Sequence, residues 1–155
     1  MSTSFCAAEA TNGFWESTSL PSIASCPAEP PSAVMEAPAM EELAARRSPS
    51  DIAALRALQR QAEEASTRDV RSLAEALFRY HRGVTFLSGN TITPLLFNAF
   101  TRVNLEFWEG YIRSEGVARC LERLAQFTEH IAAGDGMAAA QLLRTGLEDF
   151  MARIE

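Results

Sequence analysis

The sequence predicts an all-α fold, an antiparallel bundle of five to six helices behind a disordered N-terminal tail. From Met35 onward, Ala, Leu, Arg and Glu dominate, and apolar residues recur at spacings of three and four, as on one face of a helix. β-Branched residues are sparse, and the apolar and polar alternation typical of strands is missing. Because the expected connections are short, neighbouring helices are predicted to run antiparallel.

The first 34 residues differ in composition from the rest of the chain. Ser, Thr, Ala and Pro fill 20 of these 34 positions, and the prolines oppose any sustained helix. Residues 1–45 also hold six acidic side chains and no basic one, so they carry the whole net charge of −6. We therefore expect a disordered acidic tail over residues 1–34 and a helical domain over residues 35–155.

Prolines and a capping pattern set the first two predicted helices. A short helix is expected over residues 39–47, with Pro38 near its start. Ser48-Pro49-Ser50-Asp51 then combines an N-cap serine, a first-turn proline and an acid, which favours a helix to about Ala65. Its buried face is predicted to carry Ile52, Leu55, Leu58 and Ala62.

The next two predicted helices enclose a glycine turn. Ser66-Thr67-Arg68-Asp69 repeats the capping pattern and starts a helix that ends at Ser88-Gly89. Its apolar face is predicted to hold Val70, Leu73, Leu77, His81 and Val84. Thr93-Pro94 starts the most aromatic helix, over residues 94–114, and Gly116 ends it.

Gly134-Asp135-Gly136 separates the last two predicted helices. The stripe before this turn holds Val117, Cys120, Leu121, Leu124, Phe127 and Ile131. The stripe after it, on a helix from about Met137, holds Leu143, Leu147, Phe150 and Ile154.

Charge, cysteine spacing and motifs argue against several classes of function. Residues 46–155 balance 14 Arg against 14 acidic residues, so neither direct nucleic-acid binding nor membrane contact is expected. The three cysteines lack metal-ligand spacing, and neither a signal peptide nor a membrane-spanning run is evident, so we expect a cytoplasmic protein. Common catalytic motifs are missing, and enzyme activity is not expected.

Two features carry the candidate site. His81 lies on an apolar helix face, either as a hydrogen-bonded core residue or as a polar group in a pocket, so His81→Leu is expected to leave the fold intact. Asn104, Phe107, Trp108 and Tyr111 share one helix face, as core residues or as the wall of a cavity for an amphipathic molecule. The predicted ligand-binding residues are His81, Asn104, Trp108 and Tyr111, with Arg102 as a weaker carboxylate anchor.

Several motifs occur in an order that points to one family. Leu77-Phe78-Arg79-Tyr80-His81 precedes Ser88-Gly89-Asn90 and Pro94-Leu95-Leu96, and Ile131-Ala132-Ala133-Gly134-Asp135 follows later. This order resembles the FxxxH…SGNPLL and I-x-x-GD signatures of FCD domains, the C-terminal effector domains of FadR-like, GntR-type transcription regulators. Residues 41–46 and 48–52 resemble the first helix and the capped start of the second, so the resemblance covers residues 35–155.

The sequence departs from this family at two points. Many FCD domains bind a divalent metal through one Asp and three His, and the resemblance places these ligands at Leu77, His81, Leu124 and Gly146. One of these four side chains has a donor atom, so no metal or other cofactor is expected, and the cavity would be more apolar and roomier. Residues 1–45 also lack the basic recognition helix of the family's winged helix-turn-helix.

The resemblance implies a ligand-sensing and dimerisation domain that binds an amphipathic carboxylate or acyl-CoA-type effector, without a DNA-binding module in this chain. Its partners would be a fatty acyl or organic acid effector and a second copy of the chain. The alternative is a ligand-free helical module with a packed core that acts on a partner regulator.

Overall fold

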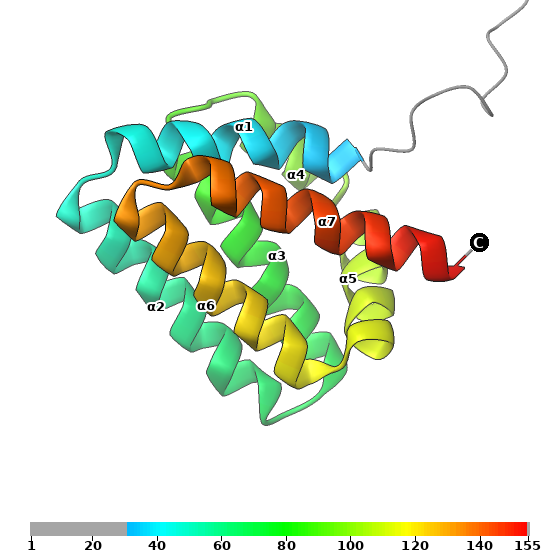
Figure 1. Ribbon diagram of the computed structural model, residues 1–155. Helices are drawn as coiled ribbons and strands as arrows, with labels where there is room; N and C mark the ends of the chain where they lie inside the picture. The colour runs from blue at the N-terminus through cyan, green and yellow to red at the C-terminus, as the bar shows by residue number, and fades with distance from the viewer. Residues whose placement is uncertain (1–30, 155) are drawn as a thin grey trace, which may run out of the picture.

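The computed structural model describes residues 31–154, and these form seven helices without a strand (Figure 1). The helices are α1 (Pro31–Arg46), α2 (Pro49–Ser66), α3 (Val70–Leu87), α4 (Thr93–Ala99), α5 (Thr101–Glu115), α6 (Val117–Ala133) and α7 (Gly136–Ile154). The predicted all-α fold is confirmed. Within residues 31–154, none of the helices has the length and apolarity needed to cross a bilayer.

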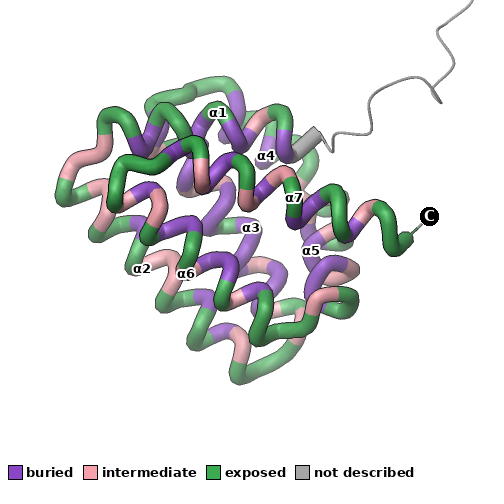
Figure 2. The backbone as a smooth tube through the Cα atoms, in the orientation of Figure 1, coloured by how far each residue is buried: buried purple, intermediate pink, exposed green. Residues whose placement is uncertain are grey.

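The central helix of the bundle is α3, which contacts α1, α2, α4 and α5. The first and last helices, α1 and α7, lie side by side along one edge of the bundle (Figure 1). α6 packs between them and α2, and also touches α5. Buried positions recur along the inner faces of α3 and α6, whereas α2 turns most of its residues outward (Figure 2). The core therefore lies among α1, α3, α5, α6 and α7.

Local capping contacts confirm several predicted helix ends. The Ser48 side chain accepts from the Asp51 amide while the Asp51 carboxylate accepts from the Ser48 amide, which is a complete capping box. Asp69 caps α3 by accepting from the Ser72 amide, whereas Ser66 remains the last residue of α2. Gly134 ends α6 in the left-handed conformation, as a C-cap glycine does (φ 85°).

The first helix begins earlier than the predicted start at residue 39. α1 starts at Pro31, and Ala33 is fully buried, so the first helix includes the last residues of the segment expected to be a tail. Pro38 lies inside the helix with its side chain exposed. Ala37 and Met40 on either side of it are buried, and this packing offsets the hydrogen bond that proline removes. The rest of the predicted tail, residues 1–30, lies outside the described residues.

The single aromatic helix predicted over residues 94–114 is divided into α4 and α5 at Phe100. This division raises the helix count in residues 31–154 above the predicted five to six. Polar side chains near the break satisfy backbone carbonyls: Thr101 Oγ1 donates to Asn98 O at 2.7 Å, and Asn104 Nδ2 donates to Phe100 O at 3.0 Å. The helical spacing of the aromatic residues continues across Phe100, and so it gave no signal of the break.

The Ser88-Gly89-Asn90 motif has a structural role at the turn between α3 and α4. Gly89 has a φ of 83°, which a residue with a side chain rarely adopts. The Asn90 side-chain oxygen accepts from the Ile92 and Thr93 amides, each at 2.9 Å, and so satisfies donors at the start of α4. The motif therefore fixes the entry of α4 into the bundle.

Candidate functional site

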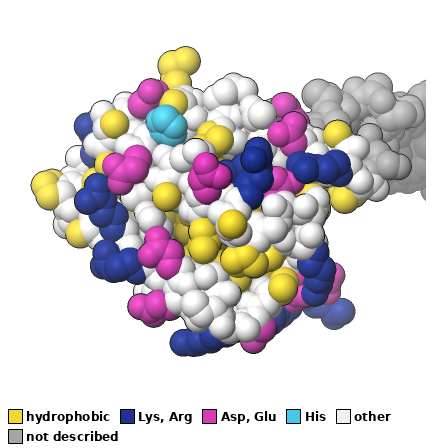
Figure 3. Space-filling view, turned by 60° about the horizontal axis from the view of Figure 1, so that its bottom comes forward, with side chains coloured by type: hydrophobic (Ala, Val, Ile, Leu, Met, Phe, Trp, Pro, Cys, Tyr) yellow, Lys and Arg dark blue, Asp and Glu magenta, His cyan; other side chains and the backbone are white. Residues whose placement is uncertain are grey.

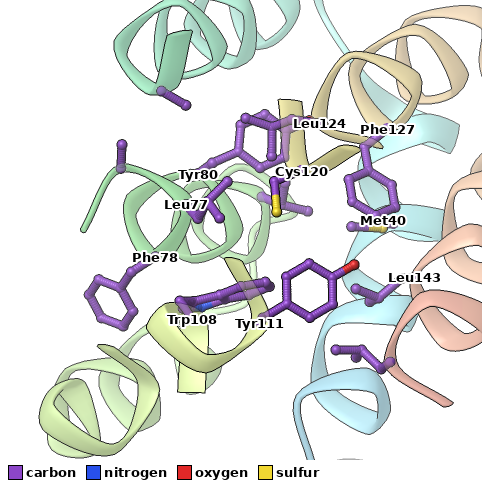
Figure 4. Packing of buried hydrophobic residues seen from close by; sticks show 14 of the residues in the cluster. Met40, Leu77, Phe78, Tyr80, Trp108, Tyr111, Cys120, Leu124, Phe127 and Leu143 are labelled. Carbon is purple, nitrogen blue, oxygen red and sulfur yellow. The ribbon is translucent and has the colours of Figure 1, made fainter. Parts of the chain in front are cut away.

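A small cavity lies where α3, α5, α6 and α7 meet. Its volume is about 20 Å³, enough for a single water molecule. The lining includes Leu77 and His81 of α3, Trp108 and Tyr111 of α5, Cys120, Arg123 and Leu124 of α6, and Gly146 of α7. Figure 4 shows the rings of Trp108 and Tyr111 facing Cys120 and Leu124. Apolar walls with a few fixed polar groups are typical of small-molecule sites.

His81 connects the cavity to α1. Its Nδ1 lies 2.5 Å from Glu36 Oε2, and both side chains are almost completely buried. The imidazole ring also stacks on Trp108, with ring centroids 4.4 Å apart. His81 is therefore a hydrogen-bonded core residue that also forms part of the cavity wall, and so it combines features of both interpretations of the sequence.

Glu36 is a buried polar residue that the sequence analysis missed. It lies on the inner face of α1, among Ala33, Ala37 and Met40. The sequence feature that points to its burial is an acidic residue at helical spacing within an apolar stripe. The predicted start at residue 39 placed Glu36 outside the first helix, so its spacing did not lead to a prediction of burial. Within the described residues, the second carboxylate oxygen of Glu36 has no hydrogen-bond partner, so the imidazole is its main polar contact.

Tyr111 and Arg123 form the polar part of the opposite wall. Arg123 Nη1 donates a hydrogen bond to the Tyr111 hydroxyl, and the guanidinium carbon lies 5.9 Å from the centroid of the Tyr111 ring. A Cβ at Gly146 would collide with Arg123 Nη1 and would lie 3.0 Å from its Cζ. The missing side chain at Gly146 therefore makes room for the guanidinium.

The charge of Arg123 is only loosely neutralised. Arg123 Nη2 lies 3.8 Å from Glu115 Oε2 and 3.9 Å from Asp149 Oδ2, both beyond hydrogen-bonding distance. Glu115, whose side chain is buried, is approached more closely by Arg119, at 3.3 Å, and by Arg153. Arg123 is thus nearly fully buried, while its nearer carboxylate, that of Glu115, is shared with Arg119 and Arg153.

Burial raises the pKa of two groups in the cavity wall. Desolvation raises the pKa of Tyr111, although the Arg123 charge and hydrogen bond lower it in part. Desolvation, with a smaller contribution from the Glu115 charge, raises the pKa of the Cys120 thiol to about 11. Both groups are therefore uncharged near neutral pH, and neither supplies a counter-charge to Arg123.

Two of the predicted ligand-binding residues lie away from the cavity. The Asn104 side-chain amide donates to the Phe100 carbonyl one turn earlier, and Asn104 is not among the residues that line the cavity. Arg102 is 91% exposed and pairs with Glu106 at 3.1 Å on the outer face of α5. Arg123 was missed because charged residues are normally assigned to the solvent face. Arg123 lies three residues after Cys120 and four before Phe127, and this helical spacing within an apolar stripe was the sequence feature that indicated its burial.

A family model described as the FCD domain matches residues 33–149, most of the chain. The chain belongs to the FCD domain family. FCD domains are the C-terminal, effector-binding regulatory domains of GntR-family transcription regulators, and these proteins are regulators rather than enzymes. The family resemblance found in the sequence is therefore confirmed. No curated protein and no solved structure gives a significant match to the chain.

The positions that correspond to the FCD metal ligands converge on the cavity, but their side chains do not fit a metal ion. Leu77, His81, Leu124 and Gly146 all line the same space. Three of the four lack a donor atom, and residues 31–154 contain no group of three or more His, Cys, Asp or Glu arranged to hold a metal. The Arg123 guanidinium beside Gly146 adds a positive charge that would repel a cation.

Proposed function

We propose that this FCD domain senses a small amphipathic carboxylate or acyl-CoA-type effector in the cavity between α3, α5, α6 and α7. The observation that carries the proposal is the composition of the cavity wall. Leu77 and Leu124 supply apolar surface, while His81, Tyr111 and Arg123 supply fixed polar groups. Such a wall suits a ligand with a hydrocarbon part and a polar or charged end.

Effector binding on this proposal requires the helices to repack. A cavity of about 20 Å³ holds one water molecule, whereas an organic effector needs several times that space. The effector would therefore select a second packing of the helices, and its binding energy would shift the population between the two packings. This shift would carry the signal to a DNA-binding module of the regulator.

We also propose that the domain dimerises through an apolar surface around α4. Exposed large apolar side chains occur on α4 and on the segments that flank it in the sequence, at Phe86, Ile92, Leu95, Leu96, Phe100 and Val103. A contiguous exposed apolar surface favours association. Regulators with FCD domains typically act as dimers, which supports a second copy of the chain as the occupant.

The charge distribution supports a regulator whose contact with DNA comes from another module. On the face shown in Figure 3, acidic and basic side chains are interspersed around a central apolar area. Arginines such as Arg71 and Arg113 are paired with Glu109 at 2.7 and 2.9 Å. DNA-binding surfaces instead cluster unpaired basic residues on one face.

A thermal-shift screen of the purified chain against fatty acids, acyl-CoAs and short organic acids tests the sensing role. A ligand at a hundred times its Kd should raise the free energy of unfolding by about 2.7 kcal/mol. Leu124→Phe fills the cavity and should abolish the shift, whereas Leu96→Phe makes the same change on the exposed face of α4 and should preserve it. A screen in which no compound stabilises the wild type contradicts the proposal.

Light scattering coupled to gel filtration tests the dimer. The wild type should elute as a dimer and Leu95→Glu as a monomer, because the new charge lies in the α4 surface. Met137→Glu places the same charge at an exposed apolar position on α7, away from the α4 surface, and should remain dimeric. A wild type that is monomeric at all concentrations refutes this part of the proposal.

The small volume of the cavity favours a second candidate function. A bundle whose interior admits only water suits a ligand-free interaction module that acts on a partner regulator. If this second function is correct, no ligand should stabilise the protein, and native mass spectrometry of the purified protein should show no bound acyl species. The chain should also form a stable complex with another regulator chain.

A further inference from the structure

Arg123 stands between the inner cavity and an outer groove. The outer groove has a volume of about 190 Å³ and lies between α6 and α7. Arg123, Leu142 and Gly146 line both spaces, so these three residues form the partition between them. Of the three, only Arg123 has a long side chain whose end can leave the partition without moving a helix.

The position of the guanidinium depends on Gly146 and on contacts that a ligand can replace. The absence of a side chain at Gly146 allows the guanidinium to rest against α7. It is held there by the Tyr111 hydroxyl and by distant carboxylates on Glu115 and Asp149. Glu115 retains Arg119 and Arg153 as partners if Arg123 moves.

The energetics of this arrangement favour an anionic ligand over a neutral one. A buried cation is costly unless a carboxylate hydrogen-bonds to it directly. Within residues 31–154, both carboxylates near Arg123 lie at 3.8 Å or more from its nitrogens. A free carboxylate in the groove can approach to about 2.8 Å and accept two parallel hydrogen bonds from the guanidinium.

We propose that Arg123 is both the gate of the cavity and the anchor for a small carboxylate, which pairs with the guanidinium in the groove between α6 and α7 and enters as that side chain leaves Gly146. The inference rests on the proposed sensing function and narrows its effector class. A free organic acid is favoured over an acyl thioester, because a thioester carbonyl carries no charge to pair with Arg123.

Cys120 provides a chemical probe of this route, because it lines the same cavity and is buried. Iodoacetate is a small carboxylate, and iodoacetamide is its neutral analogue. With either reagent the sulfur forms a bond to the CH₂ carbon, iodide leaves, and the thiol proton passes to water. The raised pKa of Cys120, about 11, slows both reactions equally, so the ratio of the two rates isolates the effect of the carboxylate charge.

The experiment measures both labelling rates at Cys120 by peptide mass spectrometry, in the folded chain and in the same chain unfolded in urea. The ratio of the iodoacetate rate to the iodoacetamide rate should be about tenfold higher in the folded chain, as expected for one charge-assisted hydrogen bond. A folded ratio equal to or below the unfolded ratio overturns the proposal.

Two pairs of variants assign the effect to Arg123. Arg123→Met should remove the preference for iodoacetate. Arg119→Met removes a neighbouring charge that lines the outer groove but not the cavity, and it should keep most of the preference. Gly146→Ala should displace the guanidinium, weaken the preference and speed iodoacetamide labelling. Gly110→Ala, where the new Cβ would lie 3.8 Å from Phe150, should behave as wild type. If Arg123→Met keeps the preference for iodoacetate, the proposal is overturned. If circular dichroism shows that Arg123→Met is unfolded, Gly146→Ala becomes the test, and an unchanged preference in that variant overturns the proposal.

The thermal-shift screen separates this proposal from the sensing function. If an effector stabilises the wild type and Arg123→Met equally, Arg123 is not the anchor while the sensing function stands. If no effector stabilises the wild type but the labelling preference depends on Arg123, the sensing function fails while the route through the gate stands.

Discussion

Two polar clusters, each with a member in the cavity wall, differ in how closely their charged groups approach each other. On the α1 side, the His81 imidazole and the Glu36 carboxylate contact each other directly at 2.5 Å, both buried. On the α7 side, Arg123 bonds to a neutral phenol, and its carboxylate neighbours are at 3.8 Å or more. The first cluster is suited to fix a helix in place, and the second is suited to exchange partners when a ligand arrives.

Glu36→Ala should have the largest effect, because it removes one member of the fully buried pair. The expected loss in the free energy of unfolding is about 3–5 kcal/mol. His81→Leu should also destabilise strongly, since it leaves the Glu36 carboxylate buried without its partner. This reverses the expectation from the sequence that His81→Leu leaves the fold intact.

Urea unfolding measures this effect, and Glu42→Ala is the matched control on the same helix. Glu42 is exposed and lies 3.9 Å from Arg46, so its removal should change the free energy of unfolding by about 0.5 kcal/mol or less. Equal losses in Glu36→Ala and Glu42→Ala would show that the buried pair does not fix α1.

Two glycines of α7 should respond differently to substitution by alanine. A Cβ at Gly136 would lie 2.5 Å from the Glu41 Cα, which is rigid backbone of α1, and the expected loss is about 1–3 kcal/mol. A Cβ at Gly146 would meet the end of the long Arg123 side chain, which can be displaced. The stability lost when the guanidinium moves should be nearly offset by the higher helix propensity of alanine, which is worth about 0.5–1 kcal/mol. Urea unfolding of both variants tests the contrast, and a larger loss for Gly146→Ala would mean that Arg123 is held rigidly.

Tyr111→Phe should cost about 0.5–1.5 kcal/mol in the free energy of unfolding, because it removes the hydroxyl that accepts from Arg123 and keeps the ring. Tyr80→Phe is its control, since it removes a buried hydroxyl that bonds to Thr128 at 2.9 Å. Thermal unfolding should show similar losses for both, while only Tyr111→Phe should weaken effector binding. An identical effect of the two variants on binding would remove Tyr111 from the site.

Arg102→Ala should have the smallest effect. Its ion pair with Glu106 is exposed, so the change in the free energy of unfolding should be within about 0.5 kcal/mol, and effector shifts should be unchanged. Thermal-shift titration checks this. Loss of the effector shift would restore Arg102 as the carboxylate anchor predicted from the sequence.

Local signals made most of the fold predictable. The cap at Ser48 and the left-handed Gly134 depend on neighbouring residues alone, so their spacing in the sequence was sufficient. The start of α1 was missed because it depends on packing of Ala33 and Met40 against distant helices, which overrides the effect of Pro38. Long-range packing of this kind leaves little trace in a short window of sequence.

The candidate site was only partly predictable for the same reason. His81, Trp108 and Tyr111 were found because aromatic and apolar residues at helical spacing indicate a buried face. Glu36 and Arg123 are charged, and a hydrophobicity pattern assigns charged residues to solvent. Their burial depends on partners that lie 45 and 12 residues away in the sequence, His81 and Tyr111, which only the folded chain brings close.

The pairing of α1 with α7 has a consequence for how the bundle forms during synthesis. Among the described helices, α1 leaves the ribosome first and α7 leaves it last, yet the most extensive packing of α1 is against α7. The α2–α3 pair can associate early, because its contacts are local in the sequence. The Glu36 carboxylate can meet His81 once α3 has been made, but until translation passes Gly136 the part of α1 that packs on α7 lacks its partner helix. That part of the α1 surface therefore stays exposed from the synthesis of α1 until α7 has been made, which is an interval in which the nascent chain is open to misassembly.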